Sequence, residues 1–276
     1  MIKEYFRITK AEKLSFYSGK ITDTMDIGSI GKLKKFINET KEVKTKISLG
    51  LLDNESRYDF TGVTVEGFND ILERGSNDII SLLKDVTKKE LKRLNDSYSV
   101  EKIEYLLDCE GDFFDVGIVM SGEPECWLKE IRTTEKKPLV ELNVLGSYGW
   151  RKDQKDIISN AGLILAYCKY FEERGIQTKI TVHFVSTHEI TGRGASNAHH
   201  YKILAKDQNQ NIDYAKVSAI LHPSFFRRGM FRVKEIRHDE KQYDSYGKSV
   251  ETKGILRLDD RSTINTIEKL FKKGNK

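Results

Sequence analysis

The sequence predicts an α/β fold over residues 108–276, with a mixed and mostly parallel sheet, and a mainly helical N-terminal region over residues 1–107 that packs on it. The main observation is the order of patterns between residues 138 and 187, where a strand, a long helix and a second strand follow one another. Two strands joined through one helix form a right-handed crossover and lie parallel in one sheet.

The N-terminal region contains three helical patterns. Apolar residues recur at helical spacing over residues 30–37 and indicate a short amphipathic helix. A second pattern, over residues 61–75, ends at Gly75, a residue type typical of helix C-caps. The third pattern runs from about residue 78 to residue 94 and predicts another amphipathic helix.

The strand–helix–strand unit has the clearest patterns in the chain. Alternating Val140, Leu142 and Val144 predict a strand with one face in the core. A helix follows over about 152–174, and Gly175 predicts its end in the left-handed conformation. The second strand covers TKITVHFVST. The apolar stripe of the helix consists of Ile157, Ala161, Ile164, Leu165, Cys168 and Phe171.

The remaining C-terminal elements have weaker patterns. We expect a strand over 199–207 and a helix over 213–221, which ends before a His-Pro pair because proline disfavours the α conformation in the residue before it. Residues 224–235 predict a turn with a short helix or strand. A strand over 253–260 and a helix over 263–271 complete the expected elements.

Composition restricts the class of protein. Hydrophobic residues make up 38% of the chain and charged residues 32%, which is apolar enough for a core and too ordinary for a disordered chain. The net charge of +5 is too small to indicate a nucleic-acid partner by itself. No apolar run approaches the ~20 residues of a membrane helix, and the charged first residues lack a secretory signal. We therefore expect a soluble cytoplasmic protein with reduced cysteines.

Two sets of motifs resemble known families. PLVELNVLGSYGW, the helix ending in YFEERG and the strand TKITVHFV resemble the first strand, first helix and second strand of a von Willebrand A-like (Rossmann-like) domain. GEPECW and HPSFFRRGMF resemble motifs of uncharacterised tailed-phage proteins that share such a scaffold. The likeness covers roughly residues 108–235, and it implies an architecture and a phage or mobile-element source rather than an activity.

The resemblance also locates a turn where metal-binding A-domains hold a cation. Those domains need an Asp-x-Ser-x-Ser loop, because a hard divalent ion requires clustered oxygen ligands. The matching positions here are Asn143, Leu145 and Ser147, so an amide replaces the carboxylate and a leucine replaces the middle ligand. We expect no metal and no cofactor at this turn.

One candidate binding segment is basic and aromatic. Phe226, Arg227, Arg228 and Arg232 lie in the run SFFRRGMFR. Arginine forms two-pronged contacts with phosphate, and exposed aromatic rings stack on bases, so this pattern predicts nucleic-acid binding. In the alternative interpretation the phenylalanines belong to the core and the arginines pair with neighbouring acids.

The second candidate segment is acidic, over residues 108–126, and we interpret it as an ordered loop packed onto the core. Asp115, Glu123 and Glu125 are expected to contact a partner, with Pro124 stiffening the loop between the two glutamates. The alternative is a metal-dependent hydrolase or nuclease that uses these carboxylates, because several acids in a glycine-rich loop suit a metal site.

No catalytic constellation is recognisable in the rest of the chain. Adjacent His199 and His200 point to opposite faces of a strand and cannot easily bind one ion together. No P-loop pattern occurs. The sequence therefore predicts a non-enzymatic, phage-type accessory protein that binds nucleic acid or a host or phage protein in the host cytoplasm.

Overall fold

The computed structural model describes residues 6–10, 20–43, 63–97, 106–108, 113–114, 120–121, 127–129, 139–147, 154–189, 196–237 and 255–258. All structural statements below refer to these residues. The polar turn before residue 139 and the expected helix over 263–271 lie outside them.

The centre of the fold is a six-stranded sheet with the strand order β1-β2-β8-β7-β6-β9. Two pairs of neighbouring strands are antiparallel, β1 with β2 and β7 with β8. The other three pairs are parallel. The mixed, mostly parallel α/β fold is thus confirmed. The strands are β1 (Arg7–Lys10), β2 (Lys20–Asp26), β6 (Leu139–Leu145), β7 (Gln177–Glu189), β8 (Ser196–Lys206) and β9 (Leu256–Arg257).

The predicted strand–helix–strand unit is present as β6, α7 (Gln154–Glu172) and β7. β6 and β7 are parallel along the whole of β6, from Leu139 beside Gln177 to Leu145 beside His183. Gly175 follows α7 with φ of 76°, the left-handed conformation that glycine adopts without steric cost. β9 lies on the other side of β6, so β6 is an interior strand of the sheet.

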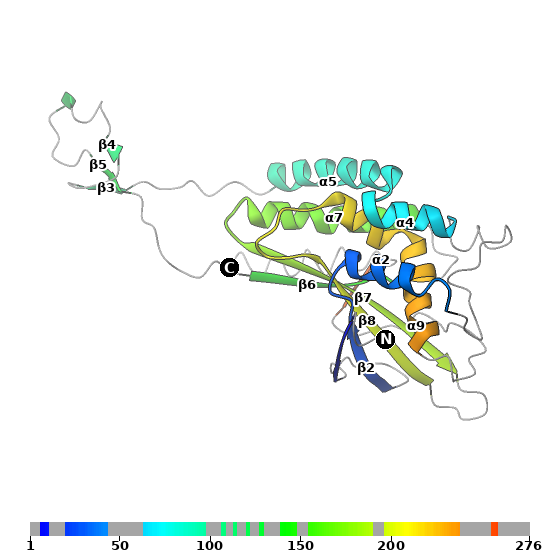
Figure 1. Cartoon of the computed structure of the whole chain (residues 1–276). Coiled ribbons are helices and arrows are strands. Elements are labelled where there is room, and N and C mark those ends of the chain that lie inside the picture. Colours follow the sequence, from blue (N-terminus) through cyan, green and yellow to red (C-terminus); the bar gives the residue numbers. More distant parts are fainter. Residues whose placement is uncertain are drawn as a thin grey trace.

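Helix α7 is buried on more sides than the predicted stripe requires. The stripe residues Ile157, Ile164 and Cys168 are buried, and so are Ile158 and Leu163, which lie off the stripe. The reason is a second helix layer: α5 (Asn77–Ser97) packs on α7, and α7 packs on the sheet (Figure 1). A helix between two layers needs apolar residues on both faces.

Among the other helices, α8 packs on β8 and α5, and α4 packs on α8 and α2 (Figure 1). α2 begins after the N-cap Ser29 and α4 after the N-cap Thr64, and each cap side chain accepts a hydrogen bond from the first turn. After α8 the chain forms one continuous helical segment, whose first part is a π-helix. These elements are α2 (Ile30–Glu39), α4 (Val65–Arg74), α8 (Tyr214–Leu221), the π-helix η2 (Phe225–Met230) and α9 (Phe231–Arg237).

The N-terminal region is not only helical. β1 and β2 belong to it and extend the main sheet, with β2 running parallel to β8. The sequence KITDTMD of β2 does not alternate regularly between apolar and polar residues. Of its two neighbouring buried residues, Met25 is apolar but Thr24 is polar. A mainly helical region packing on a separate sheet is therefore an incomplete description.

A second, small sheet lies in the segment between α5 and β6. It has the order β3-β5-β4, with both pairs antiparallel, and its strands are β3 (Leu106–Asp108), β4 (Phe113–Phe114) and β5 (Trp127–Lys129). These strands lie away from the six-stranded sheet in Figure 1. The sequence predicted a loop packed on the core here, whereas the described residues of this segment form strands that pair with one another.

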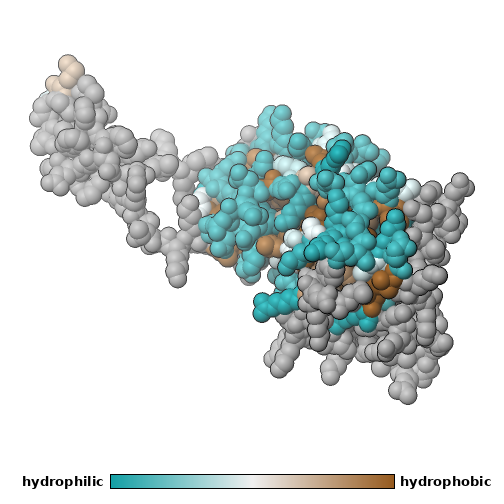
Figure 2. All heavy atoms as spheres, viewed as in Figure 1, coloured by the Kyte–Doolittle hydropathy of each residue, from teal (hydrophilic) through white to brown (hydrophobic). Residues whose placement is uncertain are grey.

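The described surface is largely hydrophilic. Figure 2 shows polar residues over most of the helix-bearing side, with apolar residues visible only in small separate groups. None of the described helices combines the length and the apolar character needed to cross a membrane.

Candidate functional site

The turn after β6 is held by internal hydrogen bonds. Ser147 is buried, and its hydroxyl oxygen accepts a hydrogen bond of 3.2 Å from the backbone N–H of Val185 in β7. Leu145 is buried in the core, and the Asn143 side-chain oxygen bonds to His183. The three positions that match the metal-binding loop therefore all take part in internal contacts of the sheet and core.

A chain of hydrogen bonds crosses four strands from Asn143. Asn143 Oδ1 lies 2.9 Å from His183 Nε2, and His183 Nδ1 lies 2.8 Å from His200 Nε2. His200 Nδ1 in turn lies 2.9 Å from Thr24 Oγ1. Because the Asn143 oxygen only accepts, His183 Nε2 donates to it. With both rings neutral, His200 donates to His183, and Thr24 donates to His200.

The two histidines at the centre of this chain contact each other directly. The two rings are stacked at 5.1 Å with 7° between their planes, and both are buried. The sequence indicated only that His199 and His200 face opposite ways, and the partner His183 on the neighbouring strand could not be found without the strand register.

The basic-aromatic segment lies inside the protein. Arg228 is 1% exposed, and its Nε and Nη2 donate to the Val63 carbonyl at 2.9 and 2.6 Å. Arg232 is fully buried; it bonds the carbonyls of Thr40 and Val43 and forms an ion pair with Glu235 at 3.2 Å. The prediction of an exposed phosphate-binding surface is therefore wrong for Arg228 and Arg232, because their guanidinium groups bind main-chain oxygens of the N-terminal region.

The aromatic residues of the same segment also pack internally. The Phe226 ring stacks on Phe184 of β7 at 5.8 Å and meets Phe231 edge-on at 5.2 Å. Arg227 is 9% exposed. The alternative interpretation, with phenylalanines in the core and an arginine paired with a nearby acid, is the one that these contacts support.

His222, at the turn before this segment, serves as a local cap. Its Nδ1 lies 2.7 Å from the Ser224 hydroxyl and accepts from the Ser224 N–H at 3.2 Å. Burial, together with the positive charge of the nearby Arg227, lowers the pKa of His222 from 6.5 to about 4. A neutral imidazole fixed to its own turn is typical of a structural histidine.

The acidic residues predicted to contact a partner, Asp115, Glu123 and Glu125, lie outside the described residues. The structure does describe the strands around them: β5 pairs with β3 on one side and with β4 on the other. Between β4 and β5, Met120 is 85% exposed. The acidic residues thus belong to a segment whose described strands pair with one another.

Comparison with known proteins gives a family without an assigned activity. A sequence model described as "Domain of unknown function (DUF7192)" matches residues 22–275. The chain belongs to this DUF7192 family. No curated protein and no solved structure matches it.

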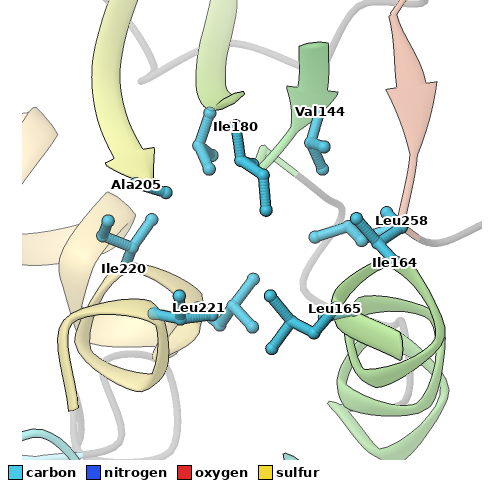
Figure 3. Close-up of a pocket in the computed structure, with 11 residues that line it drawn as sticks. Val144, Ile164, Leu165, Ile180, Ala205, Ile220, Leu221 and Leu258 are labelled. Atoms are coloured by element: carbon cyan, nitrogen blue, oxygen red, sulfur yellow. The ribbon is translucent and has the colours of Figure 1, made fainter. Parts of the chain in front are cut away.

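The DUF7192 domain has a small internal cavity between α7, α8 and the sheet (Figure 3). It has a volume of about 20 Å³, and its lining is entirely apolar, including Val144, Ile164 and Leu221. A dry space close to the size of one water molecule holds no substrate. This cavity is therefore a packing gap in the core.

The remaining reactive groups of the DUF7192 domain give no catalytic arrangement among the described residues. Burial raises the pKa of Cys168 to about 12, so its thiol stays protonated. Within the described ranges, His, Cys, Asp and Glu side chains form no group of three that could hold a metal ion.

Proposed function

We propose that this chain is a non-catalytic adaptor that binds a protein partner through residues 106–129. The scaffold is an α/β domain of the von Willebrand A-like kind, which the parallel β6–α7–β7 unit supports. The phage or mobile-element source, and action in the host cytoplasm, belong to the same proposal and rest on the GEPECW and HPSFFRRGMF motifs.

The observation that carries this proposal is the pairing of the small sheet. β3, β4 and β5 form hydrogen-bonded pairs with one another, and the segment stands between two elements that pack in the core, α5 and β6. A sheet of three strands with two or three residues each is marginally stable alone. Such an insertion is a natural place for a partner to add contacts.

Charge indicates the kind of partner. Residues 106–129 hold six acidic side chains and one lysine, whereas the whole chain has a net charge of +5. Met120, with its adaptable thioether side chain, is exposed in the same segment. A basic protein surface complements this combination, and charge complementarity accelerates association.

The contacts of the basic-aromatic segment favour a protein over nucleic acid. Phosphate binding needs guanidinium groups at the surface, and both Arg228 and Arg232 are buried against carbonyl oxygens. Moving either one to the surface would leave buried acceptors unsatisfied, at a cost of about 1–3 kcal/mol for each.

Affinity capture from expressing cells, with and without nuclease, tests the proposal. The bait variant carries Asp115→Asn, Glu123→Gln and Glu125→Gln in the full chain. We expect the unmodified chain to retain a basic protein after nuclease treatment and the triple variant to lose it, most clearly at low salt, where surface charge is least screened.

A matched control neutralises three exposed acids of α4 and α5, through Asp70→Asn, Asp78→Asn and Asp85→Asn. This variant removes the same charge from the helical surface and is expected to retain the partner. Capture that disappears with nuclease, or that both triple variants lose equally, would contradict binding through residues 106–129.

A further inference from the structure

A row of lysines lies on the solvent side of α5. Lys84, Lys88 and Lys92 follow one another at intervals of four residues, so they lie on one side of the helix, about 6 Å apart along its axis. All three are exposed, and in the part of the chain that the structure describes none of them forms an ion pair. Like charges four residues apart repel each other, so this lysine row destabilises α5 unless an anionic group lies beside it.

The positive charge of the lysine row extends onto the neighbouring helices. Lys84 Nζ lies 5.9 Å from the centroid of the Tyr214 ring of α8, and Lys169 Nζ of α7 lies 5.6 Å from the same centroid. An aromatic ring attracts ammonium groups, so Tyr214 brings the two lysines together where α5, α7 and α8 meet. Residues 84–93 of α5 hold five basic and two acidic side chains, so this half of the helix is positive overall.

The negative charge of the chain is concentrated in a different segment. Residues 106–129 hold six acids and one lysine, a net charge of −5, so the rest of the chain, out of a total of +5, carries +10. An acidic segment that follows α5 so closely repels nucleic acid, whereas it has the charge that the lysine row attracts. An acidic polypeptide is therefore the class of partner that fits the lysine row, and this chain contains one.

The acidic segment of the same copy leaves the lysine row uncovered. Lys84, Lys88 and Lys92 are all exposed in the structure, and the described strands β3, β4 and β5 pair with one another. Eight residues separate the end of α5 at Ser97 from the start of β3 at Leu106, and they reach at most roughly 28 Å when extended. That length is sufficient for residues 106–129 to contact a neighbouring copy.

We propose that two copies of this chain form a reciprocal dimer, in which residues 106–129 of each copy bind the lysine row of the other. A twofold axis between the copies brings both acidic segments and both lysine rows into use, so the assembly is closed. Leu82 of α5 is 43% exposed and Met120 is 85% exposed, so each surface also offers an apolar side chain to the other. The dimer rests on the protein-binding role proposed for residues 106–129, with a second copy as the partner.

Sedimentation velocity of the nuclease-treated full chain, at about 50 mM and about 500 mM salt, tests the dimer. We expect dimers at low salt and weaker association at high salt, because salt screens exposed charges. Two charge-reversal variants should each dimerise at least about tenfold more weakly than the unmodified chain. The helix variant carries Lys84→Glu, Lys88→Glu and Lys92→Glu, and the segment variant carries Asp115→Lys, Glu123→Lys and Glu125→Lys.

A mixture of the two variants separates a specific interface from general attraction. In the mixed pair the reversed segment meets the reversed row, and the unmodified segment meets the unmodified row, so both contacts again join opposite charges. We expect this heterodimer to match the affinity of the unmodified dimer within about threefold. Its formation also shows that both variants are folded.

A matched control reverses three exposed lysines in and directly after α2, through Lys32→Glu, Lys35→Glu and Lys41→Glu. It should leave dimerisation unchanged within about twofold. A chain that stays monomeric at low salt up to about 100 µM, a mixture that does not dimerise, or equal weakening by the α2 control would overturn the proposal. Association that nuclease treatment abolishes would assign the lysine row to nucleic acid instead.

Affinity capture distinguishes failure of the dimer from failure of the adaptor role. If the chain is monomeric but captures a different basic protein, and the variant with Asp115→Asn, Glu123→Gln and Glu125→Gln loses that protein, the dimer is wrong and the adaptor role stands. If the monomeric chain captures no basic protein, both are wrong.

Discussion

The β6–α7–β7 unit and the η2–α9 segment are both buried, but they are stabilised by different kinds of contact. In the first, strands and helix pack through aliphatic side chains such as Val144, Ile164 and Val182. In the second, arginines lie among phenylalanines, with Arg228 and Arg232 almost completely covered. Buried aliphatic residues recur with the periodicity of the helix or strand that holds them, whereas the residues that the arginines contact show no such periodicity.

Apolar spacing predicted the contacts of the β6–α7–β7 unit, whereas the run of arginines and phenylalanines wrongly predicted an exposed surface. Arg228 bonds a carbonyl 165 residues earlier in the chain, and Arg232 bonds one 192 residues earlier. Main-chain carbonyls belong to every residue type, so nothing in the sequence marks the acceptor. A run of arginines and phenylalanines therefore has the same composition whether it binds phosphate or closes a core.

The largest effect is expected from Arg232→Met, which tests whether the second kind of contact stabilises the fold. The substitution removes the buried ion pair with Glu235 and the donor to Thr40 and Val43. We expect the free energy of unfolding, measured in urea, to fall by about 3–5 kcal/mol.

A matched control exists on the surface. Arg93 pairs with Glu90 at 2.7 Å, also three residues apart, but its side chain is 48% exposed. Arg93→Met should cost less than about 1 kcal/mol. Equal effects of the two substitutions would mean that Arg232 is not buried in solution, and the nucleic-acid interpretation would regain its support.

The second effect concerns pH and the turn that leads into η2. Because burial holds the pKa of His222 at about 4 in the folded protein, against 6.5 when exposed, the unfolded chain takes up the proton first as pH falls. Stability is therefore lost between pH 6.5 and about pH 4, by about 3 kcal/mol, and the loss is complete below that range.

His222→Asn isolates this contribution. An asparagine oxygen can still accept from the Ser224 N–H and hydroxyl, which bond the imidazole now, but it does not titrate. The difference in unfolding free energy between the variant and the unmodified chain should shift in favour of the variant as pH falls from 6.5 to 4. A pH-independent difference would show that His222 is accessible to solvent.

Most helices and strands were predictable from the sequence, but the contacts between elements that lie far apart in the chain were not. Apolar spacing predicted α2, α4, α5, α7 and the strands around α7 because each element buries its own face. β2 was missed because its buried Thr24 is polar, and it is satisfied by His200 on another strand.

The smallest expected effect tests the aliphatic half of the comparison. A Cβ at Gly162 of α7 would stand 2.7 Å from Val86 Cγ1 of α5, so Gly162→Ala must push two packed helices apart. Helix propensity favours alanine by about 1 kcal/mol, whereas overpacking costs about 1–3 kcal/mol, so we expect a net loss of up to about 2 kcal/mol in urea unfolding. Gly175→Ala, where no atom lies within 4 Å but φ is 76°, should cost about 1 kcal/mol from backbone strain alone. A gain in stability for Gly162→Ala would show that α5 does not contact α7 at this point, and the aliphatic region would then be less tightly packed than the arginine-rich one.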